Sequence, residues 1–184
     1  MRTVVLVEGI SDRVAVETLA ARRGRDLEAE GVSVVALRGA GNIRSALGRY
    51  GPQGLGVRLA GLCDAGEESA FGRALEEAGL GSGLGRPEME RLGFFVCVQD
   101  LEDELIRALG VAAVEDVVAA QGELRPFRTL QKQPAQRDWT TEAQLRRFLG
   151  THSGRKAQYA EALVQALDLE RVPRPLDLLL ERVS

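Results

Sequence analysis

Short apolar runs alternate with stretches of helical spacing over the first 110 residues. Each run is four to seven residues long and is bounded by glycine or polar residues, which is typical of buried strands. The runs predict strands at residues 4–7, 32–37, 57–63 and 94–98. Apolar residues three or four apart predict a helix after each strand, around residues 14–20, 43–47, 71–78 and 101–109. This α/β order predicts a four-stranded parallel sheet sandwiched by helices.

Beyond residue 110 the strand pattern stops and only helical spacing remains. Two prolines, Pro173 and Pro175, bracket a last short segment, and the helical spacing before it covers residues 111–120, 141–149 and 155–167. We therefore predict an α/β domain over residues 1–110 and an all-helical extension over residues 111–184 that packs on it.

Composition and charge are those of an ordinary soluble protein, with 184 residues, a formal net charge of −3 and 45% hydrophobic residues. No apolar run approaches the roughly 20 residues that span a bilayer, and no leader pattern precedes the first strand. We therefore expect a cytoplasmic protein with no membrane partner. Cys63 and Cys97 each end an apolar run and are predicted to be buried, reduced thiols.

Carboxylates follow three of the predicted strands. Glu8 and Asp12 surround a glycine turn after the first strand, Asp64 follows the third, and Asp100 and Glu102 follow the fourth. Parallel strands end at one edge of a sheet, so these groups should meet there and repel one another unless a cation neutralises them. Oxygen ligands of this kind suit Mg²⁺ or Mn²⁺. For each acid alone, the alternative is the capping of a helix N-terminus.

The predicted extension contains a strongly basic segment. Between residues 125 and 156 there are eight basic and two acidic residues, a net charge of +6. Such a segment is a candidate footprint for a phosphate backbone, although a solvated helical face has the same composition. The residues predicted to bind nucleic acid are Arg125, Arg128, Lys132, Arg146, Arg147 and Arg155.

The motifs at the strand ends resemble those of the TOPRIM domain, the metal-dependent module of topoisomerases, bacterial primases and several nucleases. The resemblance rests on Val-Glu-Gly-x-Ser-Asp at residues 7–12, Cys-Asp at 63–64 and Asp-Leu-Glu at 100–102. Within this group the chain is most similar to nucleases of the OLD (overcoming lysogenization defect) family. Asp12 lies four residues after Glu8, and residues 153–160 resemble the lysine-containing helix of that family.

The resemblance implies two-metal phosphodiester hydrolysis, with DNA favoured over RNA as the substrate. Glu8 and Asp12 would hold one Mg²⁺ or Mn²⁺, Asp64 would hold or share the other, and Glu102 would complete the shell. Glu8 and Lys156 would be the catalytic residues, with Lys156 stabilising the phosphoryl transition state. The chain has 22 arginines but only two lysines, so a lysine here indicates a need for a compact ammonium group. The alternative for Lys156 is a surface position on an amphipathic helix.

Two departures from the family pattern stand out. TOPRIM sequences commonly have Asp-x-Asp after the third strand, and here the second acid is replaced by Gly66; the candidate substitute ligands are Glu67, Glu68 and Asp100. OLD nucleases also carry an ATPase domain. This sequence has no Gly-x-x-x-x-Gly-Lys-Ser/Thr motif, so an ATPase is expected as a separate partner chain. The sequence is compatible with an oligomer.

Two other functions stay open at the level of the sequence. One is a TOPRIM ribonuclease for structured RNA, which usually shows Asp-Pro-Asp where this chain has Asp-Ala-Gly. The other is a non-catalytic nucleic-acid-binding module of a repair or defence complex. Trp139 is expected either to stack on a base or to anchor the extension. His152 is expected to be a helix cap or a bystander near Lys156.

Overall fold

The centre of the molecule is a parallel sheet. The structure, a computed structural model, describes residues 2–150 and 153–184, so His152 lies outside the described residues. Within these ranges the strands are β1 (Thr3–Val7), β2 (Val32–Ala36), β3 (Arg58–Asp64) and β4 (Phe94–Cys97). They lie in the order β2-β1-β3-β4, and all neighbours are parallel. The predicted four-stranded parallel sheet is confirmed.

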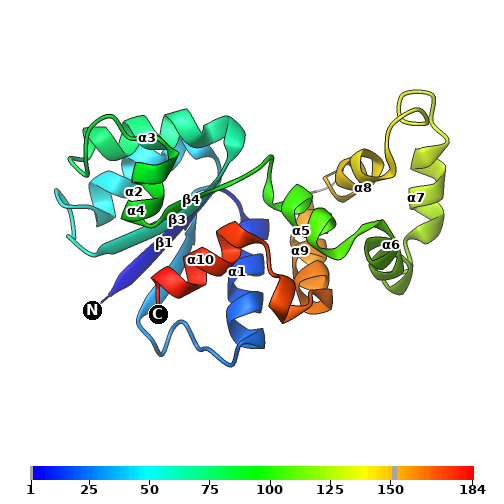
Figure 1. Cartoon of the computed structure of the whole chain (residues 1–184), viewed down its shortest axis with the longest axis horizontal. Helices are drawn as coiled ribbons and strands as arrows, with labels where there is room; N and C mark the ends of the chain where they lie inside the picture. The colour runs from blue at the N-terminus through cyan, green and yellow to red at the C-terminus, as the bar shows by residue number, and fades with distance from the viewer. Residues whose placement is uncertain (1, 151–152) are drawn as a thin grey trace.

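Helices cover both faces of this sheet (Figure 1). The helices that precede β4 are α1 (Ile10–Arg22), α2 (Ile43–Tyr50), α3 (Glu68–Glu77) and α4 (Arg86–Leu92). Those that follow it are α5 (Leu101–Leu109), α6 (Val111–Ala120), α7 (Leu124–Gln131), α8 (Thr141–Leu149), α9 (Ser153–Ala166) and α10 (Arg174–Arg182). The predicted helix around residues 14–20 is the centre of α1, which is longer than its apolar spacing indicates.

Alternate side chains of each strand enter two separate hydrophobic layers. Val5 and Val7 of β1 pack with α1, α5 and the helices of the extension, whereas Val4 and Leu6 pack with α2, α3 and α4. This alternation follows from the period of two along a strand. Because both faces are covered, all five residues of β1 are buried, as expected for a central parallel strand.

The extension is tied to the α/β part through α9 and α10. α9 packs along α1, and the guanidinium of Arg22 donates hydrogen bonds to the carbonyls of Val164 and Leu167 at 2.8 and 2.7 Å. α10 returns to lie against β3 and β4 (Figure 1). One hydrophobic core therefore contains residues from both sides of residue 110. The division into an α/β domain over residues 1–110 and an extension over residues 111–184 stays a prediction.

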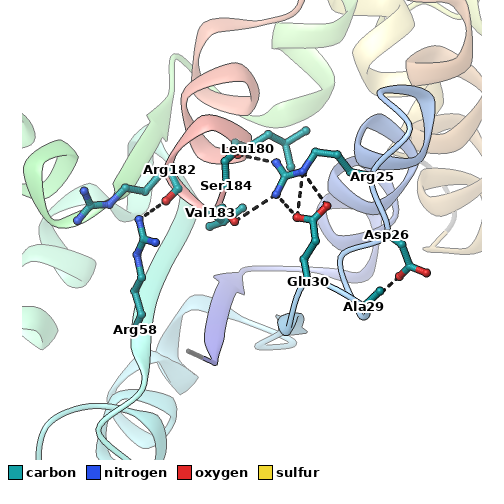
Figure 2. A network of polar contacts seen from close by, with 9 residues as sticks. All are labelled: Arg25, Asp26, Ala29, Glu30, Arg58, Leu180, Arg182, Val183 and Ser184. Atoms are coloured by element: carbon teal, nitrogen blue, oxygen red, sulfur yellow. Dashed lines mark hydrogen bonds and ion pairs between the residues drawn. The ribbon is translucent and has the colours of Figure 1, made fainter.

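Two arginines fix the end of α10 (Figure 2). Arg25 donates hydrogen bonds to the carbonyls of Leu180 and Val183 at 2.7 and 3.1 Å and also pairs with Glu30. Arg58 of β3 donates to the carbonyl of Arg182. The last carbonyls of a helix have no partner within it, so these bonds complete α10 and hold it against the sheet.

Both cysteines are buried and reduced, as predicted. They lie on opposite faces of the sheet, Cys97 in the layer of α1 and Cys63 in the layer of α3. Burial is the main cause that raises the pKa of each thiol above its usual range, so neither is a nucleophile at neutral pH. No helix in the described part of the chain is long and apolar enough to cross a membrane.

Candidate functional site

Glu8 and Asp12 lie at the turn between β1 and α1. Glu8 directly follows β1, and Asp12 is in the first turn of α1. Asp12 accepts a hydrogen bond through Oδ2 from the backbone N–H of Gly9 at 2.7 Å. Asp12 therefore has the capping role that the alternative interpretation expects. Among the described residues this is its one hydrogen bond, so Oδ1 is left for a ligand.

Asp64 lies beside Glu8 because β1 and β3 are neighbours in the sheet. Glu8 Oε1 accepts a hydrogen bond from the backbone N–H of Asp64 at 2.7 Å. The side chain of Asp64 makes no capping hydrogen bond to the turn that follows it, Ala65–Glu67. The two acids predicted to face each other across the strand ends therefore do so, with one oxygen of Glu8 already used to align them.

Glu102 and Asp100 begin α5 and are each met by a cation from the extension. Lys156 Nζ of α9 lies 3.2 Å from Glu102 Oε1, and Arg146 Nε of α8 donates to Asp100 Oδ2 at 2.7 Å. Asp100 also caps α5 by accepting from the N–H of Asp103 at 2.9 Å. Asp100 is thus fully engaged within the protein, whereas Glu102 is paired with Lys156.

Burial, and then mutual repulsion, raises the pKa values of the acids at this edge. Burial, and then repulsion by Glu8, Asp12 and other acids, raises the pKa of Asp64 to about 8. Burial, and then repulsion by Glu102 and Glu8, raises the pKa of Asp12 to about 7, although the Gly9 hydrogen bond opposes this. Burial also raises the pKa of Glu8. The site therefore contains more negative charge than its own cations balance.

Lys156 responds to the same charges in the opposite direction. Its partial burial alone lowers its pKa, but attraction to Glu102, and then to Asp100 and Asp12, raises it overall. The ammonium group is therefore held in its charged form beside the acids.

The donor set fits a hard divalent cation. Its ligand atoms are carboxylate oxygens, which Mg²⁺ and Mn²⁺ prefer, and a cation would relieve the repulsion that raises the pKa values of Asp12 and Asp64. Across residues 2–150 and 153–184, no group of three or more His, Cys, Asp or Glu side chains is arranged to hold a metal ion. In this arrangement Glu8 and Asp12 each accept a backbone hydrogen bond and Glu102 pairs with Lys156.

Gly66 faces open space. A Cβ atom placed there would meet no other atom within 4 Å, so a longer side chain fits. Of the candidate substitutes, Glu67 acts on the site by raising the pKa of Glu8 through repulsion, whereas Glu68 pairs with Arg86. Glu67 is therefore better placed than Glu68 to replace the missing acid.

A Gly66→Asp variant is expected to bind Mn²⁺ about ten-fold more tightly than the wild type, because it adds a charged oxygen ligand without steric cost. Isothermal titration calorimetry measures the affinity, and Gly66→Asn is the control of similar shape without the charge. Equal affinities for the Asp and Asn variants would contradict the prediction. If Glu67→Gln also weakened Mn²⁺ binding, the missing acid would be assigned to Glu67.

The basic residues predicted to bind nucleic acid have different surroundings. Arg155 pairs with Glu123 at 2.6 Å and stacks on Phe148, with its guanidinium carbon 4.3 Å from the ring centre, so its contacts are those of a structural residue. Arg128 makes two bonds of 2.8 Å to Glu115.

The remaining basic residues are exposed at the surface. Arg125 lies in α7 and Lys132 directly follows it, and neither makes an ion pair among the described residues. Arg146 and Arg147 are exposed on α8 and line the same cleft as Lys156. The sequence does not reveal this cleft, because it forms where α8 meets α5, far away along the chain.

Comparisons with known proteins agree with the motifs. Residues 1–65 match the family described as overcoming lysogenization defect protein-like, TOPRIM domain. No curated protein matches the chain. The predicted resemblance to the TOPRIM domain of OLD proteins is thereby confirmed over the segment that contains Glu8, Asp12 and Asp64.

The fold of the whole chain is similar to solved C-terminal regions of OLD proteins. The region from Xanthomonas campestris pv. campestris has 25% identity and a TM-score of 0.71, with 99% of this chain and 94% of that chain covered. The region from Burkholderia pseudomallei has 21% identity and a TM-score of 0.75, with 99% and 96% covered. Residues 1–65 thus resemble an OLD-like TOPRIM domain, and the whole chain has a fold similar to that of OLD C-terminal regions.

Proposed function

We propose that this chain is a divalent-metal-dependent nuclease that hydrolyses phosphodiester bonds in DNA. The observation that carries the proposal is the meeting of Glu8, Asp12, Asp64 and Glu102 at one edge of the sheet, with Lys156 held 3.2 Å from Glu102. A phosphodiester is negatively charged and is repelled by the acids of this site. It can therefore bind here only when metal ions neutralise those acids.

Each acid has a role that its contacts support. Glu8 and Asp12 would hold one Mg²⁺ or Mn²⁺ through the oxygens that face away from their backbone donors. Asp64, whose side chain makes no capping bond, would hold or share a second ion, and Glu102 would complete the set. When bound, such ions orient the attacking water and stabilise the leaving oxygen.

Lys156 would donate hydrogen bonds to a non-bridging oxygen of the phosphate. Its present partner is Glu102, and a cation held by Glu102 would compete with the ammonium group for that carboxylate. Lys156 would then turn toward the substrate with its charge intact, because a lysine ammonium beside a phosphate is protonated at neutral pH. A fixed ammonium of this kind stabilises charge that develops in the transition state.

The exposed basic residues of the extension would bind the phosphate backbone. Arg125 and Lys132 are exposed at the surface, and Arg147 is exposed and shares a cleft with Lys156. Phosphate contacts supply affinity without sequence preference. The proposal also includes an ATPase that acts together with this chain, as the resemblance to OLD nucleases implies.

The alternative that a specific observation favours is a non-catalytic nucleic-acid-binding module. Gly66 stands where TOPRIM sequences usually have an acid, so the chain would bind DNA through the extension without cutting it. Metal-dependent cleavage separates the two. The test is incubation with supercoiled plasmid and with structured RNA in Mg²⁺, Mn²⁺ or Ca²⁺; plasmid cutting in Mg²⁺ or Mn²⁺ is expected.

A Lys156→Ala variant is expected to cut plasmid about 10²–10³ times more slowly, as typical for loss of a single charge-stabilising donor. The matched control is Lys132→Ala, which removes the other lysine of the chain outside the acidic site. It should lose affinity for plasmid at raised salt but keep its cutting rate when saturated. Equal cutting rates for wild type and Lys156→Ala would remove Lys156 from the mechanism, and RNA cleavage without plasmid cleavage would favour the ribonuclease.

A further inference from the structure

A cleft of about 410 Å³ joins the acidic site to the one tryptophan of the chain. One wall is formed by Asp100 and Glu102 at the start of α5 together with Lys156 of α9. Residues of α8 and Trp139 just before it also line the cleft. The volume lies within the range of about 300–1,000 Å³ for ligand pockets. A strand whose phosphate lies at Lys156 would therefore continue toward Trp139.

Trp139 is exposed but stands on a fixed segment. Trp139 is 46% exposed, and its ring makes no aromatic or cation–π contact among residues 2–150 and 153–184. The backbone N–H of Trp139 donates to the carbonyl of Gln136 at 3.0 Å. The buried Gln144 donates to that same carbonyl at 2.8 Å. Thr140, the next residue, caps α8 by accepting from the N–H of Ala143 at 3.3 Å.

The exposure of Trp139 favours base stacking over anchoring of the extension. A tryptophan that anchored the extension would be buried, whereas Trp139 is one of the exposed large hydrophobic residues of the described chain. The core of the extension is built instead from Phe127, Phe148 and Tyr159, whose rings meet edge to face. A large exposed ring on a fixed backbone beside a charged cleft is the arrangement of a base-stacking platform.

The charges of the cleft fit a nucleic-acid strand that runs from Lys156 past α8. Arg146 and Arg147, at consecutive positions of α8, line the same cleft as Lys156 and Trp139. Arg146 is held by Asp100 and by the side chain of Gln99 at 2.7 Å, which fixes its guanidinium beside the path. The acids that line the cleft are Asp100 and Glu102, and its other charged lining residues, Arg146, Arg147 and Lys156, are basic and can meet backbone phosphates.

We propose that Trp139 stacks on an unpaired base of the strand whose phosphate lies at Lys156. The inference rests on the proposed function for the position of that phosphate. Bases inside a duplex already stack on both sides, so a single exposed ring can take only a base that is unpaired or displaced. The substrate class is therefore DNA with a single-stranded or frayed segment next to the bond that is cut, rather than intact duplex.

The single tryptophan makes the subsite directly observable. The full chain is titrated with a dye-free oligothymidine about 12 nucleotides long and with a blunt duplex, using Ca²⁺ in place of Mg²⁺. Quenching of the tryptophan fluorescence by the oligothymidine is expected, with much less quenching by the duplex. Binding is followed separately by the anisotropy of labelled copies of both probes.

Trp139→Ala is expected to bind the labelled oligothymidine about ten-fold more weakly and the duplex within about two-fold of wild type, and Trp139→Phe should recover most of the loss. Leu55→Ala, which truncates a 65% exposed residue outside the cleft, should change neither. Binding of oligothymidine without quenching, equal loss for both probes, or no oligothymidine binding at all would overturn the subsite. The titration needs no cleavage, so the two proposals are tested separately. Quenching without plasmid cutting would refute the nuclease activity and leave the subsite standing. Plasmid cutting without quenching would refute the subsite and leave the nuclease activity standing.

Discussion

A Glu8→Gln variant is expected to lose at least about 10³-fold of the metal-dependent cutting rate and yet to be more stable than wild type in metal-free buffer at pH 8. The rate falls because an amide is a weak, uncharged ligand. The stability rises because Glu8 is partly buried, and burial and the neighbouring Glu67 and Asp100 raise its pKa. The amide oxygen of Gln can still accept the hydrogen bond from the N–H of Asp64 while the repulsion disappears.

The matched control is Glu28→Gln, which removes an exposed carboxylate remote from the sheet edge and should change neither quantity. Plasmid nicking on gels gives the rate, and thermal unfolding followed by circular dichroism gives the stability. Cutting that survives in Glu8→Gln would refute the assigned metal site. A loss of both rate and stability would make Glu8 a structural residue.

The opposite effects on rate and stability follow from how the site is assembled. The acids come from strand ends and the start of α5, and their repulsion is only partly balanced by Lys156 and Arg146 from the extension. The extension thus has an electrostatic role as well as a packing role. Strain of this kind is typical of sites that are completed by a ligand.

The sheet and its carboxylates could be predicted because the information is local. The apolar runs around Val5 and Leu62 are followed directly by Glu8 and Asp64, and parallel neighbours end at one edge. The helix α4 could not be predicted, because Met89 is its one buried residue and no apolar periodicity results. It begins after Gly85 with proline in its first turn and ends at Gly93 with φ of 95°, which are boundary signals that lack a hydrophobic stripe between them.

The arrangement of the extension could not be predicted, because it depends on contacts between distant residues. Arg155 belongs to the basic segment and is predicted from the sequence to bind phosphate. Its pairing with Glu123 and its stacking on Phe148 instead hold it within the fold. Arg146 pairs with Asp100, a residue of a different helix. Charge alone therefore predicts which segment is basic, and only the packing tells which of its cations face a substrate.

In the metal-free protein, stability is expected to fall as the pH rises from about 4 to about 8. The pKa values of Asp12 and Asp64 are raised from 3.8 to about 7 and about 8. The folded protein therefore binds more protons than the unfolded chain in this window. The stability that these two groups contribute is fully present below pH 3.8 and is lost as the pH rises through their pKa values in the folded protein. An Asp12→Asn variant should be more stable than wild type by a margin that grows over this range. Thermal unfolding at several pH values measures it.

Binding of Mg²⁺ should reverse this trend because the ion replaces protons on the same carboxylates. At pH 6 both Asp12 and Asp64 are mainly protonated without metal, since their pKa values are about 7 and about 8, so binding should release up to about two protons and the affinity should rise up to about 100-fold per pH unit. Above pH 9 the release should approach zero. Calorimetry in buffers of different ionisation enthalpy counts the protons. Asp12→Asn should release one fewer and Glu28→Gln the same number, whereas binding at pH 6 without proton release would mean that the ion is held by other groups.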